Sequence, residues 1–170
     1  MVPGLTHLAD IYDAINPAAF AVTFPVLQQA AAMLGLQVQV LEVRTSDDLP
    51  SAFATAASWP AHGVIVGQSA LLLTERARLA ELAARSQLPA IYTSTEFVQA
   101  GGLMSYGTSQ RTTYQRLAAF IDKILRGARP ADLPVEQLTK VEFAVNVKAA
   151  QALGLTFPPD IAMQVTEWVE

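Results

Sequence analysis

Residues 101–133, GGLMSYGTSQRTTYQRLAAFIDKILRGARPADL, decide the fold of this chain. A short apolar strand at Leu103–Tyr106 is followed by a glycine and a long amphipathic helix. Thr108 or Ser109 can cap that helix, because a hydroxyl oxygen accepts from the free backbone N–H groups of a first turn. Gly127 ends it, since glycine tolerates the left-handed conformation found just past helices. Apolar residues recur at helical spacing and form one stripe: Tyr114, Leu117, Ala118, Ile121, Ile124 and Leu125.

The chain before this helix alternates strand patterns with helix patterns, and short loops join them. Such alternation is typical of an α/β fold, so we predict a parallel five-stranded sheet with helices on both faces. The expected strands are Leu5–Tyr12, Leu36–Val43, Gly63–Gly67, Leu88–Thr93 and Leu103–Tyr106. The expected helices run from Ala18 or Thr23 to Leu34, from Thr45 to Trp59, from Ser69 to Arg85 and from Ser94 to Ala100.

Two details of this prediction need a physical explanation. Pro25 suits the first turn of a helix better than its middle, which favours the later start at Thr23. Asp10 lies inside the first strand, where a carboxylate in a doubly covered sheet is costly unless it is paired. We therefore expect that strand to be short or less buried than its position suggests.

After the long helix, the chain returns through short elements. Val135–Leu138 and Val141–Val147 have the pattern of extended segments, and Lys148–Leu153 of a short helix. A last helix is expected to begin at the pair Pro158 and Pro159. We divide the chain into an α/β solute-binding lobe, residues 1–107, and a crossover helix with a return segment, residues 108–170, which completes the lobe.

Composition excludes several classes of protein. The 170 residues are 52% apolar and 15% charged, enough for one domain with a real core. The net charge is −4, without a basic run, which argues against nucleic acid as a partner. There is no cysteine, so a disulfide framework, a thiolate metal site and a cysteine nucleophile are all excluded.

Polar side chains gather where the predicted strands end. Ligands of open parallel sheets bind beyond the carboxyl ends of the strands. Hydroxyls, amides and helix N-termini with few charges suit a small zwitterion or neutral solute. Each serine there is equally explained as a helix N-cap, and Asn16, before a proline, as a turn residue. The rim residues are Asp13, Asn16, Thr45, Ser46, Gln68, Ser69, Ser94, Thr95, Glu96, Tyr106 and Thr108.

Enzymatic motifs are scarce. His7 and His62 fall at the amino ends of the first and third strands, away from the rim, so they support no Ser–His–Asp arrangement. No glycine-rich loop follows the first strand, so a dinucleotide or nucleoside triphosphate site has no phosphate cradle. Asp10 and Asp13 suggest a phosphoacceptor, but Tyr106 and Gly107 stand where its lysine is needed. We expect no catalysis, no cofactor and no metal site.

Several segments resemble one known family. GGLMSYG (101–107) and the segment 114–158 resemble the closing third of the substrate-binding proteins of ABC importers, in the branch related to tryptophan and tyrosine binders. ADIYDAINP (9–17), 34–54, 82–92 and EFVQAGGLMSYG (96–107) fit the same pattern in order. The resemblance implies a type I periplasmic-binding-protein fold, in which two α/β domains close on a solute.

The resemblance also implies which residues bind the solute. It places second-domain contacts at Asn16, Gln68, Ser69, Ser94 and Glu96, with Tyr106 at the hinge. Asp10 stands where the family has an apolar residue. After strand three, Gln68 and Ser69 replace an acid–amide pair of the aromatic-amino-acid branch, so the solute is left open between amino-acid-like and other polar organic molecules.

The family's amino-terminal domain has no counterpart in this sequence, which is expected to be a truncated or remnant solute-binding component. The long helix then lacks the domain surface on which it would pack. Its apolar stripe, left uncovered, would form an exposed patch larger than those found on most monomeric proteins. We expect a homodimer through the helix after Gly107. Its contact residues are Tyr114, Leu117, Phe120, Ile121 and Ile124.

Partners and location follow from the resemblance. The parent protein is expected to deliver a small solute to ABC importer membrane subunits. It would be periplasmic or at the cell surface if it carries a signal peptide. The chain as given begins MVPGLTHLAD, which has no signal pattern, so a cytoplasmic location stays open. A non-transport sensory or interaction domain that kept the fold without solute capture is the alternative function.

Overall fold

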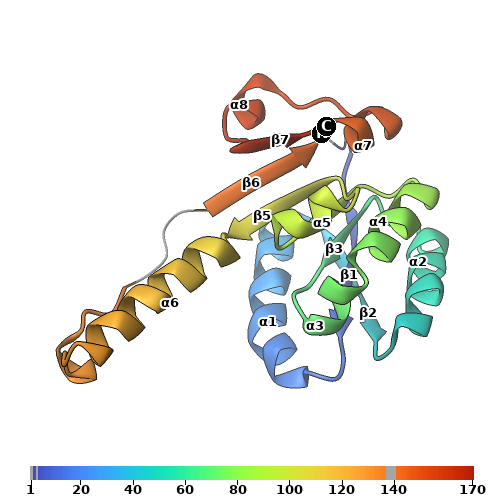
Figure 1. Cartoon of the computed structure of the whole chain (residues 1–170). Coiled ribbons are helices and arrows are strands. Elements are labelled where there is room, and N and C mark those ends of the chain that lie inside the picture. Colours follow the sequence, from blue (N-terminus) through green and yellow to red (C-terminus); the bar gives the residue numbers. More distant parts are fainter. Residues whose placement is uncertain (1, 3, 137–140) are drawn as a thin grey trace.

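The structure, a computed structural model, describes residue 2 and residues 4–136 and 141–170. The described residues form a seven-stranded sheet in the order β2-β1-β3-β4-β5-β6-β7 (Figure 1). Its strands are β1 (His7–Asp13), β2 (Gln37–Val43), β3 (Gly63–Val66), β4 (Ala90–Tyr92), β5 (Met104–Thr108), β6 (Val141–Asn146) and β7 (Glu167–Val169).

Helices connect most of these strands. Two short 3-10 turns, η1 (Ser46–Asp48) and η2 (Pro130–Asp132), lie before α2 and after α6. The α-helices are α1 (Pro17–Met33), α2 (Leu49–Ser58), α3 (Ala70–Thr74), α4 (Arg76–Arg85), α5 (Thr95–Gln99), α6 (Gln110–Leu125), α7 (Val147–Ala152) and α8 (Pro159–Ala162).

The predicted α/β class and parallel sheet are confirmed. Strands β1 to β5 pair in parallel, and β2 is an edge strand. The sheet has two strands more than the five expected. The segment Val141–Asn146 returns beside β5 in the antiparallel direction, and β7 then pairs with β6 in parallel. The predicted segment Val135–Leu138 lies partly outside the described residues.

The two faces of the sheet are covered differently. Ile11 and Val66 point into the core, which Phe53 of α2, Leu79 of α4 and Phe97 of α5 complete. On the opposite face α1 packs against the first strands. Burial of these large apolar side chains supplies most of the favourable free energy of folding. The prediction of helices on both faces is therefore confirmed, with α1 on one face and α2 to α5 on the other.

Two helices differ from their predicted bounds. Helix α1 begins at Pro17, because Asn16 caps it and Pro17 suits its first position, so Pro25 lies inside it. The expected single helix 69–85 is broken at Glu75 into α3 and α4. Glu75 has φ −86° and ψ 14°, which lies outside the α-helical region and ends α3 before α4 begins.

Helix α6 projects away from the rest of the chain (Figure 1). As predicted, Ser109 caps it, and its hydroxyl oxygen accepts from the Thr112 backbone N–H at 3.2 Å. Gly127, just past its end, has a positive φ of 100°. No residue of α6 is buried. Arg116 forms an ion pair of 2.9 Å with Glu136, which joins the returning segment to the helix.

Candidate functional site

Two neighbouring pockets open at the carboxyl ends of the parallel strands. The first, called here the α1 pocket, has a volume of about 460 Å³ and lies between α1 and the ends of β1 and β3. The second, called the α5 pocket, has a volume of about 280 Å³ and lies between the start of α5, the end of β5 and the start of α6. Thr93, directly after β4, lines both. The rim predicted from the strand ends is therefore hollowed on both sides of β4.

Two hydroxyls at the junction of the pockets have no partner among the described residues. The Thr93 Oγ1 and Ser94 Oγ atoms are buried, and neither has a hydrogen bond. Ser94 begins α5 without capping it through its side chain, which differs from the cap interpretation of the sequence. A buried polar group without a partner costs about 1–3 kcal/mol, which a ligand can recover by bonding to it.

A glycine keeps this junction narrow. A Cβ atom added at Gly107, near the end of β5, would overlap the carbonyl oxygen of Thr93. Only a residue without a side chain allows the two backbones to lie so close. The end of β5 and the start of α6 are therefore held directly against the loop that carries Thr93 and Ser94.

The α1 pocket brings together three predicted ligand residues, Asn16, Gln68 and Ser69. Two of them also cap helices. The Asn16 side-chain oxygen accepts from the Ala19 N–H at 3.4 Å, and the Ser69 hydroxyl oxygen accepts from the Leu72 N–H at 3.1 Å. These caps leave the Asn16 amide N–H groups and the Ser69 O–H to donate to a ligand.

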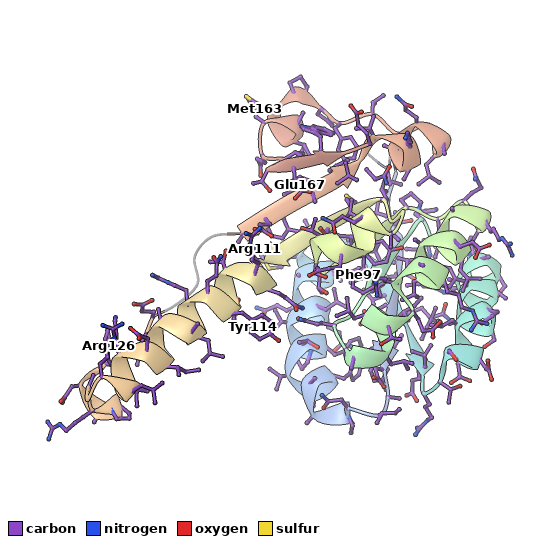
Figure 2. The ribbon with its side chains drawn as sticks, in the orientation of Figure 1. Phe97, Arg111, Tyr114, Arg126, Met163 and Glu167 are labelled. Atoms are coloured by element: carbon purple, nitrogen blue, oxygen red, sulfur yellow. The ribbon has the colours of Figure 1, made fainter. Side chains whose placement is uncertain are left out.

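The α5 pocket holds the other two strand-end predictions, Ser94 and Glu96. Thr108 and Arg111 lie on its α6 side, and Glu167 of β7 closes it. Figure 2 shows Arg111 at the root of the projecting helix and Glu167 on the nearby strand β7. This pocket is therefore polar and carries both signs of charge.

The remaining predictions lie elsewhere. Tyr106 is 57% exposed and lines a separate apolar depression with Ile91 and Met104. Its ring meets Phe143 edge to face at 5.9 Å between centroids. Tyr106 lines neither strand-end pocket. Its neighbours Ser105 and Gly107 line the α5 pocket, because neighbouring residues of a strand point to opposite faces. Thr45 and Ser46 line neither strand-end pocket, and the Asp48 carboxylate accepts from the Thr45 N–H. The Arg44 and Thr45 backbone N–H groups lower the pKa of Asp48.

Sequence reasoning missed the aromatic wall of the α1 pocket. The rings of Tyr12 and Phe20 stack at 3.8 Å between centroids, and Phe24 stacks on Phe20 at 4.7 Å. Burial and a hydrogen bond to Glu42 raise the pKa of Tyr12. The signal was present as Tyr12 beside a predicted strand end, with Phe20 and Phe24 one helical turn apart.

Asp10 also lines the α1 pocket, although it was not among the predicted ligand residues. It is only 7% exposed, and burial raises its pKa to about 6. The expectation that this strand is short or poorly buried is wrong, because β1 spans His7–Asp13 and pairs on both sides.

The described residues contain no group of three or more histidine, cysteine, aspartate or glutamate side chains arranged to hold a metal ion. His7 and His62 lie together at the amino ends of β1 and β3, with ring centroids 5.4 Å apart. None of the helices in the described part of the chain combines the length and apolarity needed to cross a bilayer.

The comparison with protein families is decisive. Residues 1–169 match the family described as ABC transporter substrate binding protein. The chain belongs to this family. It is a family of solute-binding proteins, normally periplasmic or extracellular. The resemblance in the sequence is therefore confirmed. Among curated proteins, none matches the chain.

Solved structures share the fold. A Streptococcus pneumoniae ABC domain in complex with L-Trp matches with a TM-score of 0.87 and 21% identity, over 99% of this chain and 57% of that one. A conserved domain protein from Vibrio cholerae matches with a TM-score of 0.86 and 20% identity, over 98% and 56%. The ligand-free, open form of a substrate-binding protein with adhesive properties from Clostridium difficile matches with a TM-score of 0.74 and 19% identity. That match covers 99% of this chain and 56% of the other. This substrate-binding protein thus spans a little over half the length of each.

Proposed function

We propose that this protein binds a small amino-acid-like or other polar organic solute at the carboxyl ends of its parallel strands. It would act as the solute-binding component of an ABC importer, or as part of that component. The observation that carries the proposal is the pair of buried hydroxyls of Thr93 and Ser94, which have no partner among the described residues and lie where two pockets meet. Unsatisfied donors held in a rigid pocket are ready to bond a polar solute.

The predicted residues divide between the two sides of this site. Asn16, Gln68 and Ser69 would donate from the α1 pocket, and Ser94 and Glu96 would contact the solute from the α5 pocket. The N-terminus of α1 adds a positive electrostatic potential that favours a carboxylate. Tyr106, outside both pockets, remains a proposed hinge residue.

The wider context is also a proposal. The protein would deliver its solute to ABC importer membrane subunits, with no catalysis and no nucleic acid partner. Its location would be periplasmic or at the cell surface when a signal peptide is present in the parent protein. An L-Trp-bound structural relative is in keeping with an amino-acid-like solute.

We further propose that α6 forms a homodimer contact. Four members of the predicted contact are more than 40% exposed: Tyr114, Leu117, Ile121 and Ile124. Phe120, the fifth, is half-buried and lies under the Lys123 ammonium. Figure 2 shows Tyr114 on the side of α6 turned toward the sheet and Arg126 near the outer end. A second copy would remove this stripe from water.

Solute binding is tested by NMR chemical-shift titration of the ¹⁵N-labelled chain with the common amino acids. We expect at least one to bind, and Thr93→Val to weaken it about tenfold, since one hydrogen bond is lost. Thr55→Val, on the far helix α2, is the matched control. If no amino acid or other small polar solute binds, the alternative of a sensory or interaction domain replaces this proposal.

The dimer is tested by light scattering at tens of micromolar chain. We expect a dimer, and Leu117→Glu with Ile121→Glu should convert it into a monomer, because charged side chains cannot be buried unpaired. Arg126→Glu, a charge change on the same helix, is the control. A monomer for the unmodified chain would contradict the dimer and leave solute binding untouched.

A further inference from the structure

Asp10 is the only carboxylate among the described residues with less than a tenth of its surface exposed. It lies in the middle of β1, paired in register with Val40 of β2 and Ile65 of β3. Its side chain is on the sheet face that α1 covers, away from the main core. A carboxylate at such a position is costly to the fold unless something compensates its charge.

Among the residues that the structure describes, none compensates the charge of that carboxylate. Asp10 has no hydrogen bond or ion pair with another of the described residues. Helix α1 and strand β3, which pack beside it, carry no charged side chain. Arg44, directly after β2, is 3.8 Å from Glu42 of that strand, and both side chains are more than half exposed.

The other titratable groups facing this region are acidic or neutral. Glu42 bonds Tyr12, and the Asp13 carboxylate accepts from the Ile15 N–H at 2.9 Å. The local charge is therefore negative, and Asp10 adds to it. A cation brought by a ligand would be attracted to this pocket, since unlike charges attract strongly where water is excluded.

The remaining walls of the α1 pocket are partly polar, with Asn16, Gln68 and Ser69, and partly apolar and aromatic. Phe20 and Leu27 of α1, Ile65 of β3 and the ring of Tyr12 surround the carboxylate. A metal ion would need several more oxygen or nitrogen ligands, which the described residues do not group here. An organic ammonium group needs only the carboxylate, while its hydrocarbon part fills the apolar space.

We propose that Asp10 binds the ammonium group of an amine solute whose apolar, aromatic part lies against Tyr12 and Phe20 in the α1 pocket. The inference rests on the proposed solute-binding function and narrows the solute to an organic amine. The pocket volume of about 460 Å³ is within the range of small-molecule sites. A carboxylate on the solute is not required at this position.

The pH dependence follows from the same geometry. Because burial raises the pKa of Asp10 to about 6, the carboxyl is ionised near pH 7.5 and mostly protonated near pH 5. The affinity for an amine should therefore fall about tenfold on acidification over that interval. The affinity for an uncharged solute of the same shape should not change.

Three indole probes of similar shape test the inference by NMR titration: tryptamine, neutral 3-ethylindole and the acid indole-3-propionate. Near pH 7.5 we expect tryptamine to bind at least about tenfold more tightly than the other two probes. This ratio corresponds to the free energy of one charge-assisted hydrogen bond. Asp10→Asn should remove this advantage, and Asp122→Asn, a surface carboxylate on α6, should keep it. If Asp10→Asn does not fold, the loss of the advantage near pH 5 in the unmodified chain gives the same answer.

The inference is overturned if tryptamine binds no better than 3-ethylindole near pH 7.5, or if its advantage survives Asp10→Asn or persists near pH 5. Failure to bind any probe also overturns it. In each of these cases the amino-acid titration with Thr93→Val decides separately whether the proposed solute-binding function stands.

Discussion

Helices α4 and α6 have comparable sequences and opposite surroundings. Both helices are amphipathic. Helix α4 buries the side chains of Leu79, Ala80 and Ala83, whereas no residue of α6 is buried. Figure 1 shows the difference directly, with α4 packed on the sheet and α6 extended away from it. An apolar stripe therefore predicts that a helix has a face to bury, and says nothing about which surface covers it.

The largest expected difference between the two helices is in the stability lost when one leucine of each is truncated to alanine. Leu79→Ala should lower the free energy of unfolding by about 2–5 kcal/mol, because a fully buried side chain leaves a cavity. Leu117→Ala, at a side chain 53% exposed, should cost less than about 0.5 kcal/mol in dilute, monomeric protein. Urea unfolding followed by circular dichroism measures both. Equal losses in dilute solution would show that α6 is covered within one chain.

A second test compares the buried carboxyl of the sheet with an exposed one on α6. The folded-state pKa of Asp10 is raised, so its protonated form favours folding and this advantage is lost as the pH rises from about 4 to about 6. Above that range Asp10→Asn should be more stable than the unmodified chain by up to about 3 kcal/mol, and near pH 3 the two should be equal.

The control for this measurement is Asp122→Asn, whose carboxylate pairs with Arg126 at the surface. An exposed ion pair contributes less than about 1 kcal/mol, so this variant should change little at any pH. Urea unfolding at several pH values gives the comparison. If the stability of Asp10→Asn tracks that of the unmodified chain across the whole range, Asp10 is not an uncompensated carboxylate.

The smallest expected effect concerns the two serine caps. Ser69→Ala, at the start of α3, should lower the free energy of global unfolding by about 1 kcal/mol. Ser109→Ala removes an equivalent cap from α6, but the helix contributes no buried residue to the core. Its loss should raise amide hydrogen exchange in the first turn of α6 and leave global unfolding unchanged. A fall in global stability at Ser109 as large as at Ser69 would contradict the separation of the two regions.

Local patterns predicted most elements because each has a short-range cause. The positive φ of Gly127 and the Ser109 cap are visible from neighbouring residues. The start of α1 at Pro17 was missed, because Pro25 favoured a later start. Strand β7 was not predicted, since Glu167–Val169 is short and is held only by pairing with β6. The broken helix at Glu75 was missed because the apolar pattern of the segment 69–85 continues across the break.

The sequence predicted where the candidate site lies better than it predicted which side chains are free to bind a ligand there. Asn16, Gln68 and Ser69 do share one pocket, as strand ends in a parallel sheet require. Ser94 has the sequence of a cap, yet its hydroxyl bonds no described residue. Tyr106 lines neither pocket and lies in a separate apolar depression, on the face of β5 opposite to Ser105 and Gly107 of the α5 pocket.

By itself, the sequence determined the α/β class, the capped helix after Gly107 and the membership of a solute-binding family. These depend on periodicity and on residues close together in the chain. Only the tertiary structure decided that Asp10 lies buried without a compensating charge and that Thr93 lines two pockets. Burial and charge compensation depend on which distant segments meet, and contacts between distant segments leave no local pattern in the sequence.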